Sequence, residues 1–483
     1  MKYIVTPQQM REIEDRAFQS GVDPLDLMER AAQQLVDALV DMLGGAKGKH
    51  VAFFCGRGNN GGDGLAAARI FASLGGEALI VLREEPSTPS ALHNLRRAKD
   101  LNIPVVNTLQ AEESFDAAVD ALIGIGLSSR PLSAEMEAEI ETLNGLSCPV
   151  LSVDIPSGMN ALTGACPGAC VRAQRTVTFG WAKPGHYLSP RAEFVGAIDV
   201  RDIGLKPYGA GFDLMESLEA PDLSAYLPER SVTSHKGKNG RVLMYCGSLG
   251  MAGAAAMAAL GCLRAGAGLV FIACEEAVIP ILQTLAPNAQ CLPVERAAAR
   301  PPQHDVLLAG CGIGQSETAR QNLLSLYDPS IPSVLDADAL NMLAQKPFPL
   351  GKETVITPHV GEAARLLSIS AQEVAGDMLT AASLLQTRYG AVVALKSHAS
   401  VVLDGDRLAL NTVGSPALAK GGSGDALAGI ITGLLAQGLS GYEAARIGCL
   451  WLGKAARMAH TRMGPLSPLT GDILALMGEA SLN

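Results

Sequence analysis

Short apolar runs alternate with helical patterns along most of this chain, and a polar turn with glycine commonly stands between the two. Strands that alternate with helices in this way form parallel sheets with helices on their faces. In such sheets the carboxyl ends of the strands line one crevice, where ligands bind. The sequence therefore predicts an α/β protein whose candidate sites are the polar clusters that follow strands. The expected strands with such clusters cover residues 50–55, 117–123, 149–154, 241–246, 305–309, 333–335, 354–356 and 392–395.

Composition excludes several classes of protein. The 483 residues are 48% hydrophobic and carry a formal net charge of −10, which suits two or three globular domains and disfavours a nucleic-acid partner. The ten cysteines contain no Cys-x-x-Cys pair, so we expect a reducing, cytoplasmic location and no structural zinc. The N-terminal segment is not typical of a signal peptide. Residues 242–263 are uncharged over the length of a membrane span, but their pattern favours a strand, a turn and a helix, so we expect no membrane segment.

The chain divides near its middle. Residues 165–206 are irregular and rich in glycine and proline, and residues 214–227 show no strong period, which is typical of a linker. We therefore expect one domain over residues 1–215 and a second over residues 222–483.

The stretch Gly421-Gly422-Ser423-Gly424-Asp425 precedes an apolar helical pattern. Its glycines leave backbone N–H groups free at the start of a helix, and such groups bind anions. A carboxylate repels an anion, so Asp425 indicates a general base that removes a proton from a hydroxyl during phosphoryl transfer. The alternative is a helix that is merely capped by Ser423 or Asp425.

A second glycine-rich stretch covers residues 56–64 and contains a G-x-G-x-x-G pattern between a strand and an expected helix over residues 65–74. This arrangement is typical of dinucleotide binding, as in an NAD-dependent dehydrogenase. However, Asn59, Asn60 and Asp63 bring side-chain oxygens into the turn, which suits a hard cation or a sugar hydroxyl. A simple glycine turn, in which these side chains bond their own backbone, is the alternative.

Other polar clusters follow the remaining strands. Asp120 precedes a glycine-bearing loop over residues 122–130, and Asp154 is followed by Ser157. In the second half, His359 follows a Thr-Pro turn, and residues 396–400 supply a cation and hydroxyls that suit a nucleotide phosphate. Each of these clusters also has a structural explanation as a turn or a cap.

Taken together, the motifs give the chain a specific resemblance. It resembles the bifunctional NAD(P)HX repair enzymes over nearly its whole length. The matching segments are 59–64, 120 with 124–130, and 154–158 in the first half, and 235–240, 247–248, 336–338, 357–359 and 421–429 in the second half.

The resemblance implies a Rossmann-like three-layer α/β/α domain followed by a ribokinase-like α/β domain. It also implies the substrate, which is NADH or NADPH hydrated at C6 of the nicotinamide ring. The first domain would interconvert the R and S epimers of this hydrate. The second would phosphorylate the C6 hydroxyl of the S epimer from ADP, and departure of phosphate would then restore NAD(P)H.

For the epimerase, the resemblance implies that Asp154 is the acid or base and that potassium is held by Asn60, Asp120 and Ser157. The implied contacts to the hydrate are Asn59, Asn60, Gly61, Gly62, Asp63, Gly124, Ile125, Gly126, Leu127, Ser128, Ser129, Arg130 and Asp154.

For the dehydratase, the resemblance implies that Asp425 is the base and that magnesium accompanies the nucleotide. The implied contacts to the hydrate are Ala254, Gly314, His359 and Asp425, and those to ADP are Lys396, Ser397, His398, Ala399, Ser400 and Gly424. The chain departs from the family pattern at Ser397, at Ser400 and at residues 415–417.

The partners that we expect are therefore small molecules, NAD(P)HX and ADP, together with a second copy of the chain in a homo-oligomer. The competing interpretations are a ribokinase-type kinase for a vitamin or sugar, a dehydrogenase, and an N-terminal interaction module without activity.

Overall fold

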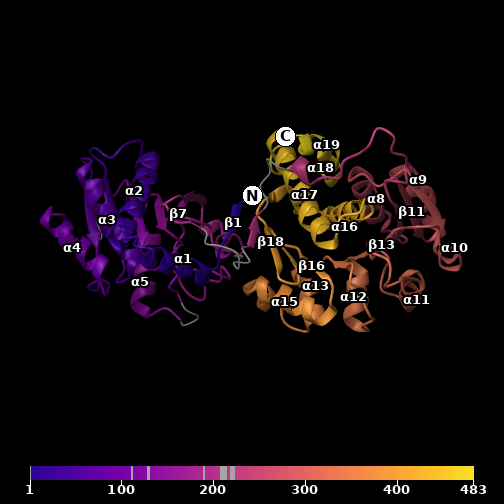
Figure 1. Cartoon of the computed structure of the whole chain (residues 1–483), viewed down its shortest axis with the longest axis horizontal. Coiled ribbons are helices and arrows are strands. Elements are labelled where there is room, and N and C mark those ends of the chain that lie inside the picture. The colour runs from indigo at the N-terminus through magenta and orange to yellow at the C-terminus, as the bar shows by residue number, and fades with distance from the viewer. Residues whose placement is uncertain are drawn as a thin grey trace. The chain divides into compact units, whose positions relative to one another are not determined.

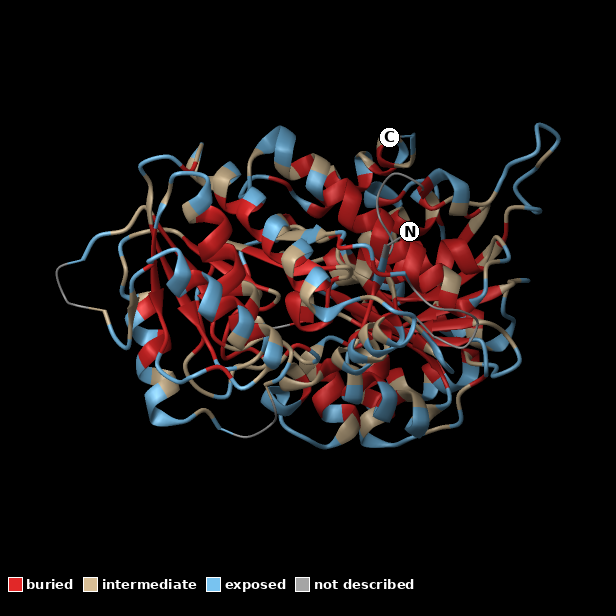
Figure 2. Cartoon of the chain, turned by 60° about the vertical axis from the view of Figure 1, so that its left-hand side comes forward, coloured by how far each residue is buried: buried red, intermediate tan, exposed pale blue. Residues whose placement is uncertain are grey.

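The computed structural model describes residues 2–109, 113–127, 131–188, 191–206, 215–217 and 223–482 (Figure 1). It divides into two compact units, which are Tyr3–Leu214, called here the N-terminal unit, and Met215–Asn483 together with Met1–Lys2, called the C-terminal unit. In both units the strands are mostly buried, and most of the exposed residues lie on helices and loops (Figure 2).

The N-terminal unit contains a seven-stranded parallel sheet in the order β4-β3-β2-β5-β6-β7-β8. Its strands are β2 (His50–Cys55), β3 (Glu77–Val81), β4 (Val105–Val106), β5 (Ala117–Ala121), β6 (Val150–Val153), β7 (Arg175–Phe179) and β8 (Ala197–Arg201). Its helices are α1 (Pro7–Gln19), α2 (Pro24–Leu43), α3 (Asn59–Ser73), α4 (Pro89–Asp100), α5 (Ala134–Asn144) and α6 (Gly185–Leu188), with a 3-10 turn η1 at Ala192–Phe194. Strand β1 (Lys2–Ile4) precedes α1, and Ile4 forms a bridge with Ala182.

Alternating side chains of the central strand face two separate cores. Phe53 packs in a core with residues of α2, α3 and α4, whereas its neighbour Phe54 packs in a core with Ile140 and Leu143 of α5. Successive side chains of a strand point to opposite faces of the sheet. The sheet therefore has helices on both faces, which confirms the expected three-layer, Rossmann-like arrangement.

The first two helices begin at sequence signals for a helix N-terminus, and the second also ends at a sequence signal for a helix C-terminus. Thr6 and Gln9 form a reciprocal capping box at α1, and Pro7 occupies the first helical position. Helix α2 begins after the Asp23 cap and ends at Gly44, which adopts a left-handed conformation.

Helix α3 corrects one expectation, because it begins at Asn59 rather than at residue 65. Three glycines of the expected loop, Gly61, Gly62 and Gly64, therefore lie in its first turns and serve packing, whereas Gly56 and Gly58 precede the helix. A Cβ on Gly61 would lie 1.8 Å from the carbonyl oxygen of Gly56, and one on Gly62 would lie 2.6 Å from Cε of Met28. The absence of side chains lets the helix start directly against the strand that precedes it.

The C-terminal unit contains a larger, mixed sheet that includes the order β9-β18-β17-β16-β15-β14-β13-β10-β11-β12. Strands β15, β14, β13, β10, β11 and β12 run parallel to β16, whereas β17 pairs with both β16 and β18 in antiparallel fashion. The bounds of the strands are β9 (Met215–Ser217), β10 (Arg241–Tyr245), β11 (Leu269–Cys274), β12 (Gln290–Pro293), β13 (Val306–Ala309), β14 (Ser333–Leu335), β15 (Thr354–Ile356), β16 (Val392–Leu395), β17 (Ser400–Asp404) and β18 (Arg407–Asn411).

Helices cover both faces of this sheet. Figure 1 shows α8, α16 and α17 on one side and α11, α12, α13 and α15 on the other. Their bounds are α7 (Leu223–Tyr226), α8 (Ala252–Arg264), α9 (Ile279–Leu285), α10 (Val294–Ala299), α11 (Glu317–Leu326), α12 (Ala337–Gln345), α13 (Val360–Leu367), α14 (Ala371–Gly376), α15 (Met378–Tyr389), α16 (Ser423–Leu435), α17 (Gly441–Met463), α18 (Thr470–Ala475) and α19 (Met477–Leu482), with 3-10 turns η3 (Glu276–Val278) and η4 (Pro416–Leu418).

Two expectations for the middle of the chain are tested by these elements. The uncharged residues 242–263 form β10 and α8, as expected, and none of the described helices is long and apolar enough to cross a lipid bilayer. The expected linker over residues 214–227 is wrong in part, because it contains β9 and α7. Strand β9 is only three residues long and pairs with β18, so its sequence has too few residues to show a period.

Helices α8 and α16 pack with their backbones in direct contact. A Cβ on Gly429 would lie 2.0 Å from the carbonyl oxygen of Ala258, and one on Gly261 would lie 2.5 Å from that of Ala426. The small residues that open the second domain therefore serve close packing, and this packing fixes the position of the first turn of α16.

We predict that Gly429→Ala destabilises the C-terminal unit by about 2–4 kcal/mol, because the added methyl group meets rigid backbone rather than a movable side chain. The matched control is Gly253→Ala on α8, whose Cβ meets nothing within 4 Å and which should be neutral or stabilising by up to about 1 kcal/mol. Denaturant unfolding of the two variants measures the difference, and equal stability would contradict the packing argument.

Candidate active sites

The N-terminal unit has a cavity of about 460 Å³ at the carboxyl ends of its central strands. Seven of the residues that the sequence indicated line it: Asn59, Asn60, Asp63, Gly124, Ile125, Gly126 and Asp154. Gly61 and Gly62 do not line it and pack inside α3 instead, and Leu127 also lies outside the lining. Ser128, Ser129 and Arg130 lie outside the described residues.

Asp154 has an unusual backbone conformation, and its side chain pairs with a buried cation. It follows β6 with a positive φ of 64°, which is rare for a residue with a side chain. Lys183, which is 1% exposed, donates from Nζ to Oδ1 of Asp154 at 2.5 Å and to the hydroxyl of Thr178 at 2.8 Å. The hydroxyl of Thr178 also donates to Asp154 Oδ1 at 2.8 Å. Two donors therefore converge on one carboxylate oxygen.

His186 supports the same loop as a neutral side chain. Its Nδ1 accepts a hydrogen bond from the backbone N–H of Lys183 at 2.9 Å, so the proton is on Nε2, which donates to the carbonyl oxygen of Asp154 at 2.8 Å. Burial, together with the charge of Lys183, lowers the pKa of His186 to about 4. The positive charge beside Asp154 thus comes from Lys183.

Two further carboxyl groups face this cavity, and their protonation differs from that of Asp154. Burial raises the pKa of Asp154, but the charge and hydrogen bond of Lys183 outweigh burial and hold it below the usual value. Burial and the charge of Asp154 raise the pKa of Asp63 well above its usual value and that of Glu14 to about 7. Near neutral pH the cavity therefore contains both an ionised carboxylate and protonated carboxyl groups.

The three residues that were assigned to potassium lie near one another. Asp120 is fully buried and accepts hydrogen bonds from the hydroxyl of Ser157 at 2.5 Å, from that of Ser152 at 2.8 Å and from two backbone N–H groups. Asn60 approaches the same loop at Gly124, and its Nδ2 is buried without a partner among the described residues.

The chemistry of this set fits a hard cation. No cationic side chain among the described residues pairs with Asp120, and burial raises its pKa in spite of the hydrogen bonds. Carboxylate, hydroxyl and amide oxygens are the ligands of hard cations, and a cation would supply the missing positive charge.

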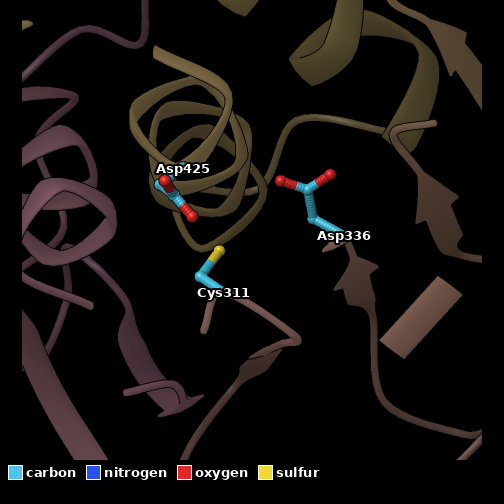
Figure 3. A group of neighbouring side chains, drawn as sticks. All are labelled: Cys311, Asp336 and Asp425. Carbon is cyan, nitrogen blue, oxygen red and sulfur yellow. The ribbon is translucent and has the colours of Figure 1, made fainter. Parts of the chain in front are cut away.

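In the C-terminal unit, the first turn of α16 brings Asp425 to a second acidic cluster. Cys311, Asp336 and Asp425 place one ligand atom each within 4.8 Å of one another (Figure 3). Asp336 follows β14 and Cys311 follows β13, so the cluster lies at the carboxyl ends of neighbouring parallel strands. Burial, together with the charge of Asp336, raises the pKa of Asp425 above its usual value.

Lys396 balances the negative charge of Asp336. Its Nζ lies 2.6 Å from Asp336 Oδ1, and both side chains are largely buried. Burial lowers the pKa of Lys396, but the charges of Asp336 and Glu362 outweigh burial and raise it. A Cβ on Gly424 would lie 3.4 Å from Nζ of Lys396, so this ammonium lies against the first turn of α16.

The start of α16 excludes the capping alternative. The N-cap is Gly422, with a φ of 91°, and no side chain caps the helix. The hydroxyl of Ser423 lies 3.4 Å from that of Thr470, away from the N-cap role, and the carboxyl group of Asp425 faces Cys311 and Asp336. An uncapped helix N-terminus with a nearby lysine suits a phosphate group.

The remaining predicted residues of this half have varied surroundings. Gly314 has a φ of 73° and donates its N–H to Asp338 Oδ2 at 2.9 Å, and Ala254 lies in the first turn of α8. His359 caps α13 by accepting from the N–H groups of Gly361 and Glu362.

The predicted nucleotide residues form the turn between β16 and β17. The hydroxyl of Ser397 accepts from the N–H of Ala399 at 3.2 Å, Ser400 begins β17, and His398 lies between them. Of this group only Lys396 points to the acidic cluster, and a backbone bridge joins it to His359.

Sequence reasoning missed Glu14, Lys183 and Cys311 as members of these sites. Glu14 lies on a helix whose sequence showed only a charged pattern. Cys311 lies between two glycines in a turn, and no separate signal in the sequence indicated its side chain. Lys183 had a usable signal, because it follows β7 by four residues and precedes Pro184 and Gly185, which is the position of the other strand-end clusters.

Comparison with known families agrees with both halves. The family described as YjeF-related protein N-terminus matches residues 24–185, and the family described as NAD(P)H-hydrate dehydratase matches residues 242–476. A bifunctional NAD(P)H-hydrate repair enzyme of Escherichia coli is 37% identical over 436 residues, which is 89% of this chain and 84% of that protein. The corresponding enzyme of Coxiella burnetii is 34% identical and covers 98% of both chains.

Solved structures match the C-terminal unit. An ADP/ATP-dependent NAD(P)H-hydrate dehydratase of Bacillus subtilis, crystallised with ATP and magnesium, is 30% identical with a TM-score of 0.50 and covers 54% of this chain and 96% of its own. A ribokinase-like superfamily protein of Enterococcus faecalis is 27% identical with a TM-score of 0.51 and covers 57% of this chain and 97% of its own.

These matches confirm the ribokinase-like fold and favour a repair enzyme over a kinase for a vitamin or sugar. From its two matched halves and its identity to full-length relatives, the chain belongs to the family of bifunctional NAD(P)H-hydrate repair enzymes, with an epimerase half followed by a dehydratase half.

Proposed function

We propose that Asp425 removes the proton from the C6 hydroxyl of S-NAD(P)HX while the terminal phosphoryl group of ADP arrives at the N-terminus of α16. The single observation that carries this proposal is the free helix start, with Gly422 at its cap and the carboxyl group of Asp425 beside it. Backbone N–H groups of this turn stabilise charge on the moving phosphoryl group. Phosphate then leaves more readily than water would, and NAD(P)H, AMP and phosphate are the products.

Lys396 serves both the nucleotide and the base. Its ammonium lies between Asp336 and the Gly424 turn, where it attracts the phosphates of the nucleotide. It also balances the negative charge of Asp336, which reduces the electrostatic repulsion between Asp336 and ionised Asp425. The turn at Ser397, His398, Ala399 and Ser400 belongs to the proposed nucleotide site, and Ala254, Gly314 and His359 belong to the proposed hydrate site.

Magnesium accompanies the nucleotide in this proposal. Asp336 and Asp425 offer carboxylate oxygens, which magnesium prefers, whereas the thiol of Cys311 is not such a ligand. Since Asp425 acts as the base, the phosphates and Asp336 would hold the ion. When bound, magnesium neutralises charge on the phosphates. The relative from Bacillus subtilis, which was crystallised with ATP and magnesium, supports the use of a nucleotide and of this ion.

In the N-terminal unit, we propose that the cavity binds NAD(P)HX and that Asp154 exchanges a proton with the hydroxyl at C6. Potassium would be held by Asn60, Asp120 and Ser157 and would supply positive charge beneath the loop that carries Gly124. The buried carboxylate of Asp120, which lacks a cationic partner among the described residues, supports this assignment.

Three further properties belong to the proposal. The domain boundaries at residues 1–215 and 222–483 stay predictions. A cytoplasmic location is supported by the ten cysteines, all of which are free thiols. Assembly into a homo-oligomer also stays a prediction, which sedimentation can test.

We predict that Asp425→Asn lowers the rate of dehydration by about 10²–10⁴-fold and leaves epimerisation unchanged, because an amide cannot accept the hydroxyl proton. The near-ultraviolet absorbance of the reduced nicotinamide ring follows dehydration, and chromatography of the two epimers follows epimerisation. Asp406→Asn, at an exposed position, is the control. Each variant is measured with ADP and with ATP, and a stable phosphorylated product would instead support a kinase.

The dehydratase rate should rise with pH through a pKa above that of an ordinary aspartate. The base is active only when ionised, and burial together with Asp336 raises the pKa of Asp425, so activity is lost as pH falls through this raised value. A pH profile of kcat measures it. If the residual activity of Asp425→Asn still falls with decreasing pH in the same range, the titrating group is not Asp425.

Potassium should raise the melting temperature of the wild type, since a ligand that binds only the folded state stabilises it by mass action, by about 1.4 kcal/mol for each tenfold excess over Kd. The comparison salt is tetramethylammonium chloride at equal ionic strength. Asp120→Asn and Ser157→Ala should both lose the difference between the two salts. Retention of the full potassium effect in both variants would remove these residues from the cation site.

A further inference from the structure

Three carboxyl groups converge on the cavity of the N-terminal unit from three separate elements. Glu14 comes from α1, Asp63 from the first turns of α3, and Asp154 from the turn after β6, and all of them line the cavity. The family resemblance assigned roles to Asp63 and Asp154 only. Glu14 therefore has no function in the account given so far.

The three groups differ in their partners. Asp154 has a buried counter-ion in Lys183 and a hydrogen bond from Thr178. By contrast, Glu14 makes no hydrogen bond or ion pair within the described part of the chain, although it is mostly enclosed. A carboxyl group without a partner in an enclosed site is costly when charged, and a proton removes the cost.

We propose that Glu14 is the proton donor of the epimerase, working across the cavity from the base Asp154. This inference rests on the proposed placement of NAD(P)HX in that cavity. Inversion at C6 requires that a hydroxyl leave from one face of the ring and return on the other, so an acid and a base are both needed.

The proposed step balances as follows. Glu14 gives its proton to the C6 hydroxyl, the C6–O bond breaks, and water departs while the lone pair of N1 forms an N1=C6 iminium. A water molecule then forms a new C6–O bond on the opposite face and gives a proton to Asp154. The substrate is inverted, Glu14 is ionised and Asp154 is protonated. Return of one proton from Asp154 to Glu14 resets the site, and Asp63, which is in charge interaction with both groups, lines the same cavity.

The electrostatics of the cavity support this division of roles. Burial, and then the charge of Asp154, raise the pKa of Glu14 to about 7, with a smaller contribution in the same direction from Asp15; Lys183 and Arg11 oppose them. Asp63 also faces this group, and Arg57 lines the same cavity. Since Lys183 lowers the pKa of Asp154, one carboxyl group is ionised and the other protonated near neutral pH.

The test uses the full chain without nucleotide, so that the dehydratase is idle, and a purified single epimer of hydrated NADH. The rate of appearance of the other epimer, minus the rate without enzyme, is measured against pH. In the wild type the rate should fall as pH rises through about 7, because Glu14 loses the proton that it must donate. Glu14→Gln should lower the rate by about 10²–10⁴-fold at pH 6 and abolish this limb.

Two comparisons separate a chemical role from a structural one. Glu14→Asp should restore part of the rate together with the alkaline limb, since it keeps the carboxyl group. Glu12→Gln is the matched control, because its side chain lies on the same helix, accepts from Gln8 at 3.1 Å and does not line the cavity. Melting temperatures of all variants show whether they fold.

The outcomes distinguish this inference from the proposal on which it rests. If folded Glu14→Gln keeps the wild-type rate or the wild-type limb while Asp154→Asn is inactive, Glu14 is not the donor and the cavity remains the epimerase site. If Glu14→Gln and Asp154→Asn both keep full activity, the cavity itself is not the epimerase site.

Discussion

Both candidate active sites depend on the repulsion between carboxyl groups that the fold brings together away from water. Two like charges 4 Å apart repel by about 4 kcal/mol at an effective dielectric constant of 20, so neighbouring buried carboxyl groups do not all ionise together. In each half one buried lysine pairs with a single carboxylate, Lys183 with Asp154 and Lys396 with Asp336. The unpaired neighbours, Glu14 in one half and Asp425 in the other, have raised pKa values.

The same arrangement serves different chemistry in the two halves. In the N-terminal unit the paired carboxylate, Asp154, faces the cavity and is the proposed base. In the C-terminal unit the paired carboxylate is a neighbour of the proposed base, and the lysine lies where a phosphate would bind. In the N-terminal unit the lysine therefore shifts the pKa of the proposed base directly. In the C-terminal unit the lysine acts on the proposed base through a neighbouring carboxylate.

Glycines hold these groups at the required positions by permitting contact between backbones. Gly61 lets α3 begin directly against the turn after β2, which places Asn60 and Asp63 at the cavity. Gly261 and Gly429 let α8 and α16 touch, which places Asp425 over the strand ends that carry Cys311 and Asp336. Gly61 and Gly429, which belong to sequence motifs of the family, therefore also have a structural role. Substitution at such a position would change the site through the backbone, even where the glycine touches no ligand.

The sequence by itself determined the fold class, most strands and the clusters that follow them, because the period of apolar residues and the chemistry of glycine turns act over a few residues. It also indicated Asp154 and Asp425 as candidates, since Asp154 stands at the end of a strand and Asp425 in the first turn of a helix. Only the tertiary structure decided their partners. Lys183 lies 29 positions from Asp154 and Glu14 lies 140 positions before it in the chain. Protonation depends on burial and on distances across the cavity, and local patterns contain neither of these, so the division of acid and base roles required the folded chain.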